Sequence, residues 1–110
     1  MEFKDEGNIS IKKGSKKKIK CHKVFCKPLN REVMIHENTD DKKQTTVSDF
    51  ITGYRMFDIP IEPIYVEPSH VKEGFKNFVK HYTIEGIEEE FKRIEKLISE
   101  EKTVTNGTRR

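Results

Sequence analysis

Hydrophobic positions concentrate in two stretches on either side of a polar segment at residues 37–48. In the first stretch, residues 19–26 and 31–36 are rich in β-branched and aromatic side chains, which favour strands. They flank Lys27-Pro28-Leu29-Asn30, in which proline presets a turn dihedral and asparagine tolerates a left-handed one. These features predict a β-hairpin over residues 19–36 with a four-residue loop.

The polar segment and the residues after it carry weaker signals. Residues 37–48 predict an exposed loop, and Ser48 is a candidate N-cap for a short helix over residues 49–57. Gly53 weakens this helix by about 1 kcal/mol relative to alanine. Three prolines then predict an extended segment over residues 59–66, available to pack or to pair at a sheet edge.

The second hydrophobic stretch has helical spacing. One stripe recurs every three or four residues and is formed by Val71, Phe75, Phe78, Val79 and Tyr82. A second stripe with the same spacing is formed by Ile84, Ile87, Phe91, Ile94, Leu97 and Ile98. Ser69 is a plausible N-cap for the first helix, and a break near residues 81–83 separates it from a second helix over residues 84–101. The pattern predicts an antiparallel helical hairpin, with one bent continuous helix as the alternative.

Taken together, these elements predict an α+β fold. A small antiparallel sheet built on the hairpin at residues 19–36 would pack against a C-terminal helical hairpin at residues 70–101. Residues 1–18 mix charged residues with glycine and serine, so they predict a flexible basic arm, with a short strand at residues 9–11 as an option. Residues 19–101 would form one domain, and residues 102–110 a disordered tail.

Composition adds a location and a charge asymmetry. No run approaches the eighteen apolar residues that a membrane span needs, and no apolar signal segment opens the chain, so we expect a cytoplasmic protein. Residues 1–31 hold ten basic and three acidic residues, a net charge of 10 − 3 = +7. Residues 32–110 hold twelve basic and sixteen acidic residues, a net charge of 12 − 16 = −4. The chain is therefore predicted to be dipolar.

The basic charge is densest at residues 12–27, which contain eight lysines and no acidic residue. Lysines that neutralise phosphates release condensed cations, which gives sequence-independent affinity for nucleic acid. We therefore expect a small accessory or regulatory protein that contacts nucleic acid, or another anionic protein or membrane surface, through its arm and hairpin. The candidate binding residues are Lys12, Lys13, Lys16, Lys17, Lys18, Lys20 and Lys23. A solvated arm without a specific ligand is the alternative.

The two cysteines and a nearby histidine are the candidate metal ligands or nucleophiles. Cys21 and Cys26 are five residues apart, so they point to opposite faces of a strand, and a paired C-x-x-C knuckle is absent. If the hairpin pairs Cys26 with Arg31, Cys21 falls opposite His36, which is the minimum for an activated thiol or for half a zinc site. The alternative, which we favour, is that both cysteines are small buried residues with free thiols and that no metal binds.

Motifs of catalysis are lacking from the sequence. It contains no glycine-rich phosphate loop, no Ser/His/Asp constellation and no metal-ligand cluster of suitable spacing. The chain is also short for an enzyme that must build a pocket. We therefore expect a protein that is not an enzyme and that uses no cofactor.

The second helical stripe offers an alternative function. Its seam resembles a coiled-coil contact for a partner or for a homodimer, formed by Ile87, Phe91, Ile94 and Ile98. The chain would then be a protein-binding inhibitor or adaptor of the kind that phages and mobile elements carry, acting through this stripe or through the segment at residues 59–66. Ordinary packing of the stripe onto the hairpin is the competing interpretation.

Overall fold

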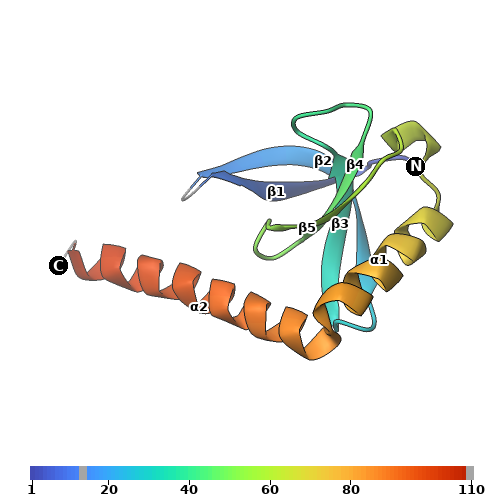
Figure 1. The fold of residues 1–110 in the computed structure, drawn as a ribbon. Coiled ribbons are helices and arrows are strands. Elements are labelled where there is room, and N and C mark those ends of the chain that lie inside the picture. The colour runs from blue at the N-terminus through green and yellow to red at the C-terminus, as the bar shows by residue number, and fades with distance from the viewer. Residues whose placement is uncertain (13–14, 109–110) are drawn as a thin grey trace.

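The structure, a computed structural model, describes the backbone of residues 1–12 and 15–108 and the side chains of residues 1–11 and 15–96. It contains a five-stranded antiparallel sheet followed by two helices (Figure 1), which confirms the predicted α+β class. The elements in chain order are β1 (Asp5–Lys12), β2 (Ser15–Cys26), β3 (Arg31–Glu37), β4 (Thr45–Asp49), β5 (Arg55–Ile59), the 3-10 turn η1 (Pro63–Tyr65), α1 (Pro68–Tyr82) and α2 (Ile84–Thr108).

The hairpin predicted at residues 19–36 is present with the expected register. Cys26 pairs with Arg31, and Cys21 falls opposite His36. Asn30 adopts a left-handed φ of 50°, and its N–H donates to the Lys27 carbonyl oxygen at 3.1 Å. The turn chemistry therefore sets the register of β2 and β3, as local sequence can do when the loop is short.

The N-terminal residues form a strand where the sequence predicted a flexible arm. β1 pairs antiparallel with an extended β2, from the pair Asp5 and Cys21 to the pair Lys12 and Ser15. Ile9 is only 4% exposed, because one face of β1 covers a small apolar cluster. A flexible arm over residues 1–18 is thus wrong: burial on one face of β1 organises a segment whose lysine content had suggested disorder.

Residues 38–44 form a loop as predicted, but residues 45–49 form β4 and residues 55–59 form β5 where the sequence predicted the end of the loop and a short helix. All five residues of β4 are buried although four of them are polar. Asp49 ends the strand by accepting hydrogen bonds from the N–H and the hydroxyl of Thr52 at 2.8 and 2.7 Å, which favours a turn over a helix. Val47 then pairs with Phe57 across the hairpin. The predicted helix over residues 49–57 is therefore wrong.

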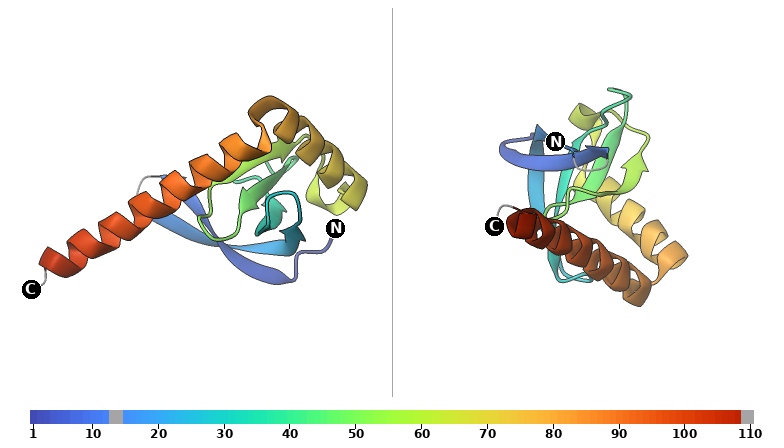
Figure 2. Two further views of the ribbon diagram at one scale, coloured as in Figure 1. Left: turned by 90° about the horizontal axis from the view of Figure 1, so that it is seen from below. Right: turned by 90° about the vertical axis from the view of Figure 1, so that its left-hand side faces the viewer.

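The sheet is a simple meander that curls on itself. Its strand order is β1-β2-β3-β4-β5, and the turn between β4 and β5 reaches back to the outer edge of β1. The Ser10 N–H donates to the Gly53 carbonyl oxygen at 2.9 Å, and the Ser10 hydroxyl donates to the Thr52 carbonyl oxygen at 3.0 Å. Figure 2 shows the resulting half-closed sheet, with β1 folded over one side.

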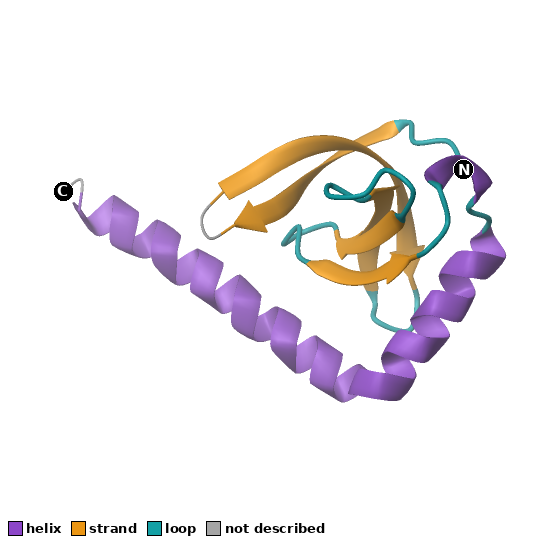
Figure 3. Cartoon of the chain, turned by 45° about the horizontal axis from the view of Figure 1, so that its top comes forward, coloured by secondary structure: helices purple, strands orange, loops and turns teal. Residues whose placement is uncertain are grey.

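The two helices diverge instead of forming a hairpin. Helix α1 begins at Pro68 with Glu67 as N-cap, where the sequence had suggested Ser69. Thr83, with a φ of 58°, ends α1 and redirects the chain, so that α1 and α2 form an open V around the sheet (Figure 3). α2 continues to Thr108, so the helix covers most of the tail that the sequence predicted to be disordered.

The core lies mainly between the sheet and the V of helices. Buried strand residues there contact buried helix residues; the cluster comprises Cys26, Leu29, Val33, Ile35, Val47, Ile59, Val66, Val71, Ile87, Phe91 and Ile94. A smaller cluster on the opposite face of the sheet contains Ile9, Cys21 and Met34, under the curl of β1. Among the helices in the described part of the chain, none combines the length and apolarity that crossing a membrane requires.

Candidate functional site

The lysine-rich segment lies in a two-stranded ribbon formed by β1 and the first part of β2, here called the basic ribbon (residues 5–12 and 15–21). It extends from the body of the sheet in Figure 1. Successive side chains of a strand alternate between faces, so Lys16, Lys18 and Lys20 share one face and Lys17 lies on the other. The first three stand opposite Ser10, Asn8 and Glu6, respectively. The ribbon thus presents cations on both faces.

These ribbon lysines are exposed, and three of them have contacts within the chain. Lys16 Nζ donates to the Thr52 carbonyl oxygen at 2.9 Å, which ties the ribbon to the turn after β4. Lys18 and Lys20 both approach the Glu6 carboxylate, at 3.8 and 3.5 Å. Exposed pairs of this kind contribute about 0–1 kcal/mol, so Lys18 and Lys20 remain free to exchange Glu6 for another anion.

The remaining candidate lysines differ in position. Lys23 lies on the body of the sheet, where its Nζ is 3.5 Å from the Glu32 carboxylate and 4.7 Å from the centre of the Phe50 ring. The side chains of Lys12 and Lys13 fall outside the described residues. The structure therefore brings four candidates together on the ribbon and sets Lys23 apart.

The distribution of carboxylates sharpens the charge of the ribbon. Asp5 and Glu6 lie at its base, and the sequence has no acidic residue between Gly7 and Arg31. The outer part of the ribbon consequently carries lysines without compensating charge of its own. The net charge of this part is positive, and such a charge attracts polyanions over a range that becomes shorter as the salt concentration rises.

The thiols and the imidazole considered as metal ligands are buried. Cys21 and Cys26 are free cysteines, and burial raises the pKa of both thiols. A raised pKa lowers the thiolate fraction that metal binding and nucleophilic attack require. Among the side chains of residues 1–11 and 15–96, no group of three or more His, Cys, Asp or Glu is placed to hold a metal ion.

His36 is buried, and both nitrogens of its ring have hydrogen-bond partners within the chain. Its Nδ1–H donates a hydrogen bond to the Glu37 carbonyl oxygen at 2.9 Å, so in the neutral ring Nε2 accepts a hydrogen bond from the Ser48 hydroxyl at 2.8 Å. Burial lowers the pKa of the imidazole and favours this neutral form. Ser48 is 1% exposed, so a substrate has no access to its hydroxyl.

The helical stripe predicted to contact a partner lies inside the chain. Ile87, Phe91 and Ile94 are 4–6% exposed and pack in the core against the sheet. The side chain of Ile98 lies outside the described residues. For Ile87, Phe91 and Ile94 the interpretation as a partner surface is therefore corrected, because a sheet with one apolar face needs these side chains as its own cover.

The proline-rich segment is divided between interior and surface. Ile59 and Val66 are buried at its two ends, whereas Ile64 and Tyr65 in η1 are 73% and 67% exposed. The segment thus forms an exposed turn between two buried positions.

Two features were missed by the sequence interpretation. The first is a buried ion pair between Arg31 and Asp49, whose residues lie on neighbouring strands. The second is a groove of about 650 Å³ between β2 and α1, here called the β2–α1 groove. Apolar side chains from the sheet, including Val24 and Ile35, face Val71 and Phe75 of α1 across it. The apolar positions of β2 and the apolar stripe of α1 are both visible in the sequence. That they face each other across a groove depends on the tertiary structure.

Comparison with protein-family models found no match, and neither curated proteins nor solved structures yielded a similar chain.

Proposed function

We propose that this protein binds duplex DNA through the basic ribbon. The lysines would contact the phosphates of the DNA backbone, so affinity would depend little on base sequence. The observation that carries the proposal is the ordered pairing of β1 with β2. It places exposed lysines on both faces of a ribbon whose outer part has no carboxylate. A paired ribbon holds these charges in a fixed array, so less conformational entropy is lost on binding than with a free arm.

The shape of the ribbon supports a duplex as the ligand. The major groove of B-DNA is about 12 Å wide and admits a two-stranded β-ribbon. In such a position Lys17 would face one wall of phosphates, while Lys18 and Lys20 would face the other. The ribbon offers few side chains that read base edges, so its affinity would be that of non-specific binding, with Kd about 10⁻⁴–10⁻⁶ M at physiological salt.

The salt dependence of duplex binding tests this proposal. With four to six phosphates neutralised, the slope of log K against log salt should be about −4 to −5. The triple variant Lys17→Gln, Lys18→Gln and Lys20→Gln should make that slope shallower by about 2–3. Lys16 is left in place because its contact with the Thr52 carbonyl oxygen supports the fold.

A matched triple variant controls for overall charge. Lys42, Lys43 and Lys96 are exposed and lie outside the ribbon. Replacing these three by glutamine removes the same charge and should leave the slope close to that of the original protein. Equal slopes for the two triple variants, or no binding at low salt, would refute the proposal. Equal affinity for polyglutamate would show instead a general anion-binding surface.

A further inference from the structure

The end of β2 that adjoins the turn has an open edge. β1 pairs with β2 only as far as Cys21, whereas β2 continues to Cys26 along β3. The Lys23 N–H donates to the Asp5 carboxylate at 2.9 Å, so the backbone groups of Lys23 point away from β3. Phe25 lies two residues further along the strand, and its backbone groups therefore point the same way.

The pairing of β3 supports the same orientation independently. The Phe50 N–H donates to the Glu32 carbonyl oxygen at 3.1 Å, so the backbone groups of Glu32 face β4. Phe25 lies opposite Glu32 in the register and forms a pair without mutual hydrogen bonds. In the described part of the chain, no backbone partner meets Phe25 on its outer side. Its N–H and carbonyl are therefore available, together with the carbonyl of Lys23.

This open edge borders the β2–α1 groove. Val24 and Phe25, which are 37% and 53% exposed, line the groove from the strand side. Val71 and Phe75 line it from α1, so an apolar strip runs beside an unpaired strand edge. Exposed apolar side chains beside unpaired backbone groups are the features that strand-adding peptide sites use.

The charged side chains that line the groove are all basic. Lys27 at the turn and both Lys72 and Lys76 on α1 are exposed and lie among its lining residues. All of the lining residues belong to the described part of the chain, and none is Asp or Glu. An apolar strip with a rim of lysines is complementary to a ligand with apolar and acidic side chains.

We propose that the β2–α1 groove binds an extended segment of a partner protein, which adds as a strand to the edge of β2 at Lys23–Phe25. Alternate side chains of that segment would enter the groove, and acidic side chains would meet Lys27, Lys72 and Lys76. An extended ligand is favoured over a helix because only an extended backbone satisfies the free groups of Phe25. About five residues of the ligand would span the edge and the rim at about 3.3 Å per residue.

Selection from a displayed library of random dodecapeptides against the full chain tests the proposal without assuming a sequence. We expect enrichment of peptides in which apolar and acidic residues alternate. For an enriched peptide made synthetically, N-methylation at alternate positions should abolish binding, because only alternate N–H groups face the strand edge. N-methylation at the intervening positions should be tolerated.

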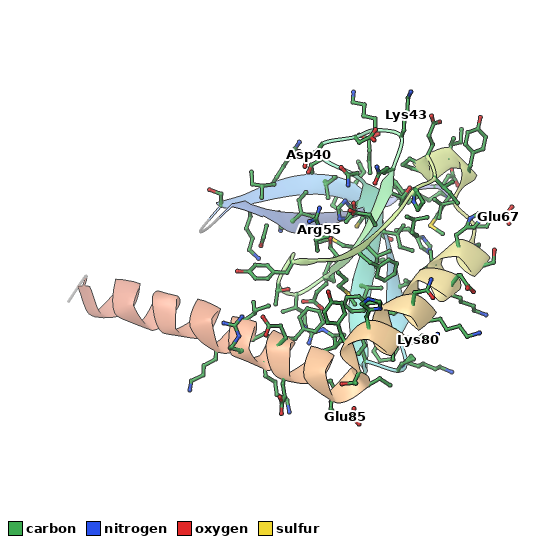
Figure 4. All side chains as sticks on the ribbon, viewed as in Figure 1. Asp40, Lys43, Arg55, Glu67, Lys80 and Glu85 are labelled. Carbon is green, nitrogen blue, oxygen red and sulfur yellow. The ribbon has the colours of Figure 1, made fainter. Side chains whose placement is uncertain are left out.

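Charge reversal on α1 locates the site. The double variant Lys72→Glu and Lys76→Glu should weaken the peptide by about tenfold or more. The matched control, Lys80→Glu with Lys92→Glu, reverses two exposed lysines that are not among the lining residues and should leave affinity unchanged (Figure 4 labels Lys80). The glutamine substitutions in the ribbon should also leave it unchanged.

Several outcomes would overturn the proposal. They are a selection without enrichment, peptides with helical spacing of apolar residues, peptides rich in lysine, and equal weakening by the two double variants. A dimer in light scattering that dissociates only in the Lys72→Glu and Lys76→Glu variant would assign the groove to a second copy of this chain instead.

Discussion

Arg31 at the start of β3 and Asp49 at the end of β4 form a bidentate ion pair. Arg31 Nη2 donates to Asp49 Oδ2 at 2.9 Å, and Nε donates to Oδ1. Asp49 is fully buried and also accepts the two hydrogen bonds from Thr52. Arg31 extends to Glu95 at 2.7 Å and lies 4.2 Å from the centre of the Phe91 ring.

This pair connects parts of the fold that are distant in sequence. Through Thr52 it shapes the turn that meets β1, and through Glu95 and Phe91 it attaches α2 to the sheet. Planar, bidentate pairing of guanidinium with carboxylate gives a defined geometry that lysine would not reproduce. The position of the basic ribbon and that of α2 therefore depend on the same two side chains.

Removing one partner of this pair should be strongly destabilising. Asp49→Ala leaves the largely buried Arg31 without its main counter-charge and should lower the free energy of unfolding by about 3–5 kcal/mol. Urea denaturation measures the loss. Glu95→Gln is the control, because that carboxylate is 40% exposed, and it should cost about 1 kcal/mol or less. Equal losses in the two variants would contradict this account.

Replacing Phe91 distinguishes a core residue from an interface residue. Phe91→Ala should open a cavity and cost about 3–5 kcal/mol of stability. Because Phe91 packs within its own chain, thermal melts should show the same loss at every protein concentration. Tyr82→Ala, at a position 60% exposed, should change the melting temperature much less. A loss of stability that depends on protein concentration would show instead that Phe91 lies at an interface between chains.

Gly53→Ala should loosen the closure of the sheet. Gly53 has a φ of 75°, and an added Cβ would collide with the Asn8 carbonyl oxygen on β1. Strain of this kind costs about 1–3 kcal/mol, which a shift of the urea midpoint would reveal. Gly86→Ala is the matched control. Its added Cβ would lie 3.2 Å from the Thr83 hydroxyl, a milder contact than that at Gly53, so we expect a smaller loss of stability. A larger loss for Gly86→Ala would argue against the close contact between β1 and the turn.

Acid should destabilise the protein through His36. Burial lowers the pKa of this imidazole in the folded state, so the unfolded chain binds a proton more readily below the ordinary pKa of about 6.5. The stability that neutral His36 provides is complete above that pH and is lost as pH falls through the lowered pKa. Urea denaturation between about pH 7.5 and 5.5 should show this decline.

The histidine control uses two variants. His36→Gln should flatten the decline in stability between those pH values. His81→Gln, at an exposed position on α1, should retain it. An unchanged pH profile in His36→Gln would assign the acid sensitivity to other groups.

The sequence alone was enough to predict those elements that depend on residues close to one another in the chain. The loop residues Pro28 and Asn30 set the turn, and the turn set the register that places Cys21 opposite His36. The stripe from Ile84 to Ile94 predicted a helix because a spacing of three or four residues places apolar side chains on one face of a helix. These features depend on residues within a few turns of the chain.

Tertiary structure decided those elements for which the local sequence predicted a different conformation. β4 is polar in sequence yet fully buried, because partners such as Arg31 satisfy its side chains from other strands. β1 contains one deeply buried isoleucine, and besides its pairing with β2 it forms hydrogen bonds with a turn some forty residues away. The direction of α2 follows from Thr83 and from the sheet that its stripe covers. Hydrogen bonds and burial between distant segments leave no periodic pattern in the sequence. Only the folded structure therefore shows how the ribbon is held against the sheet and where the β2–α1 groove lies.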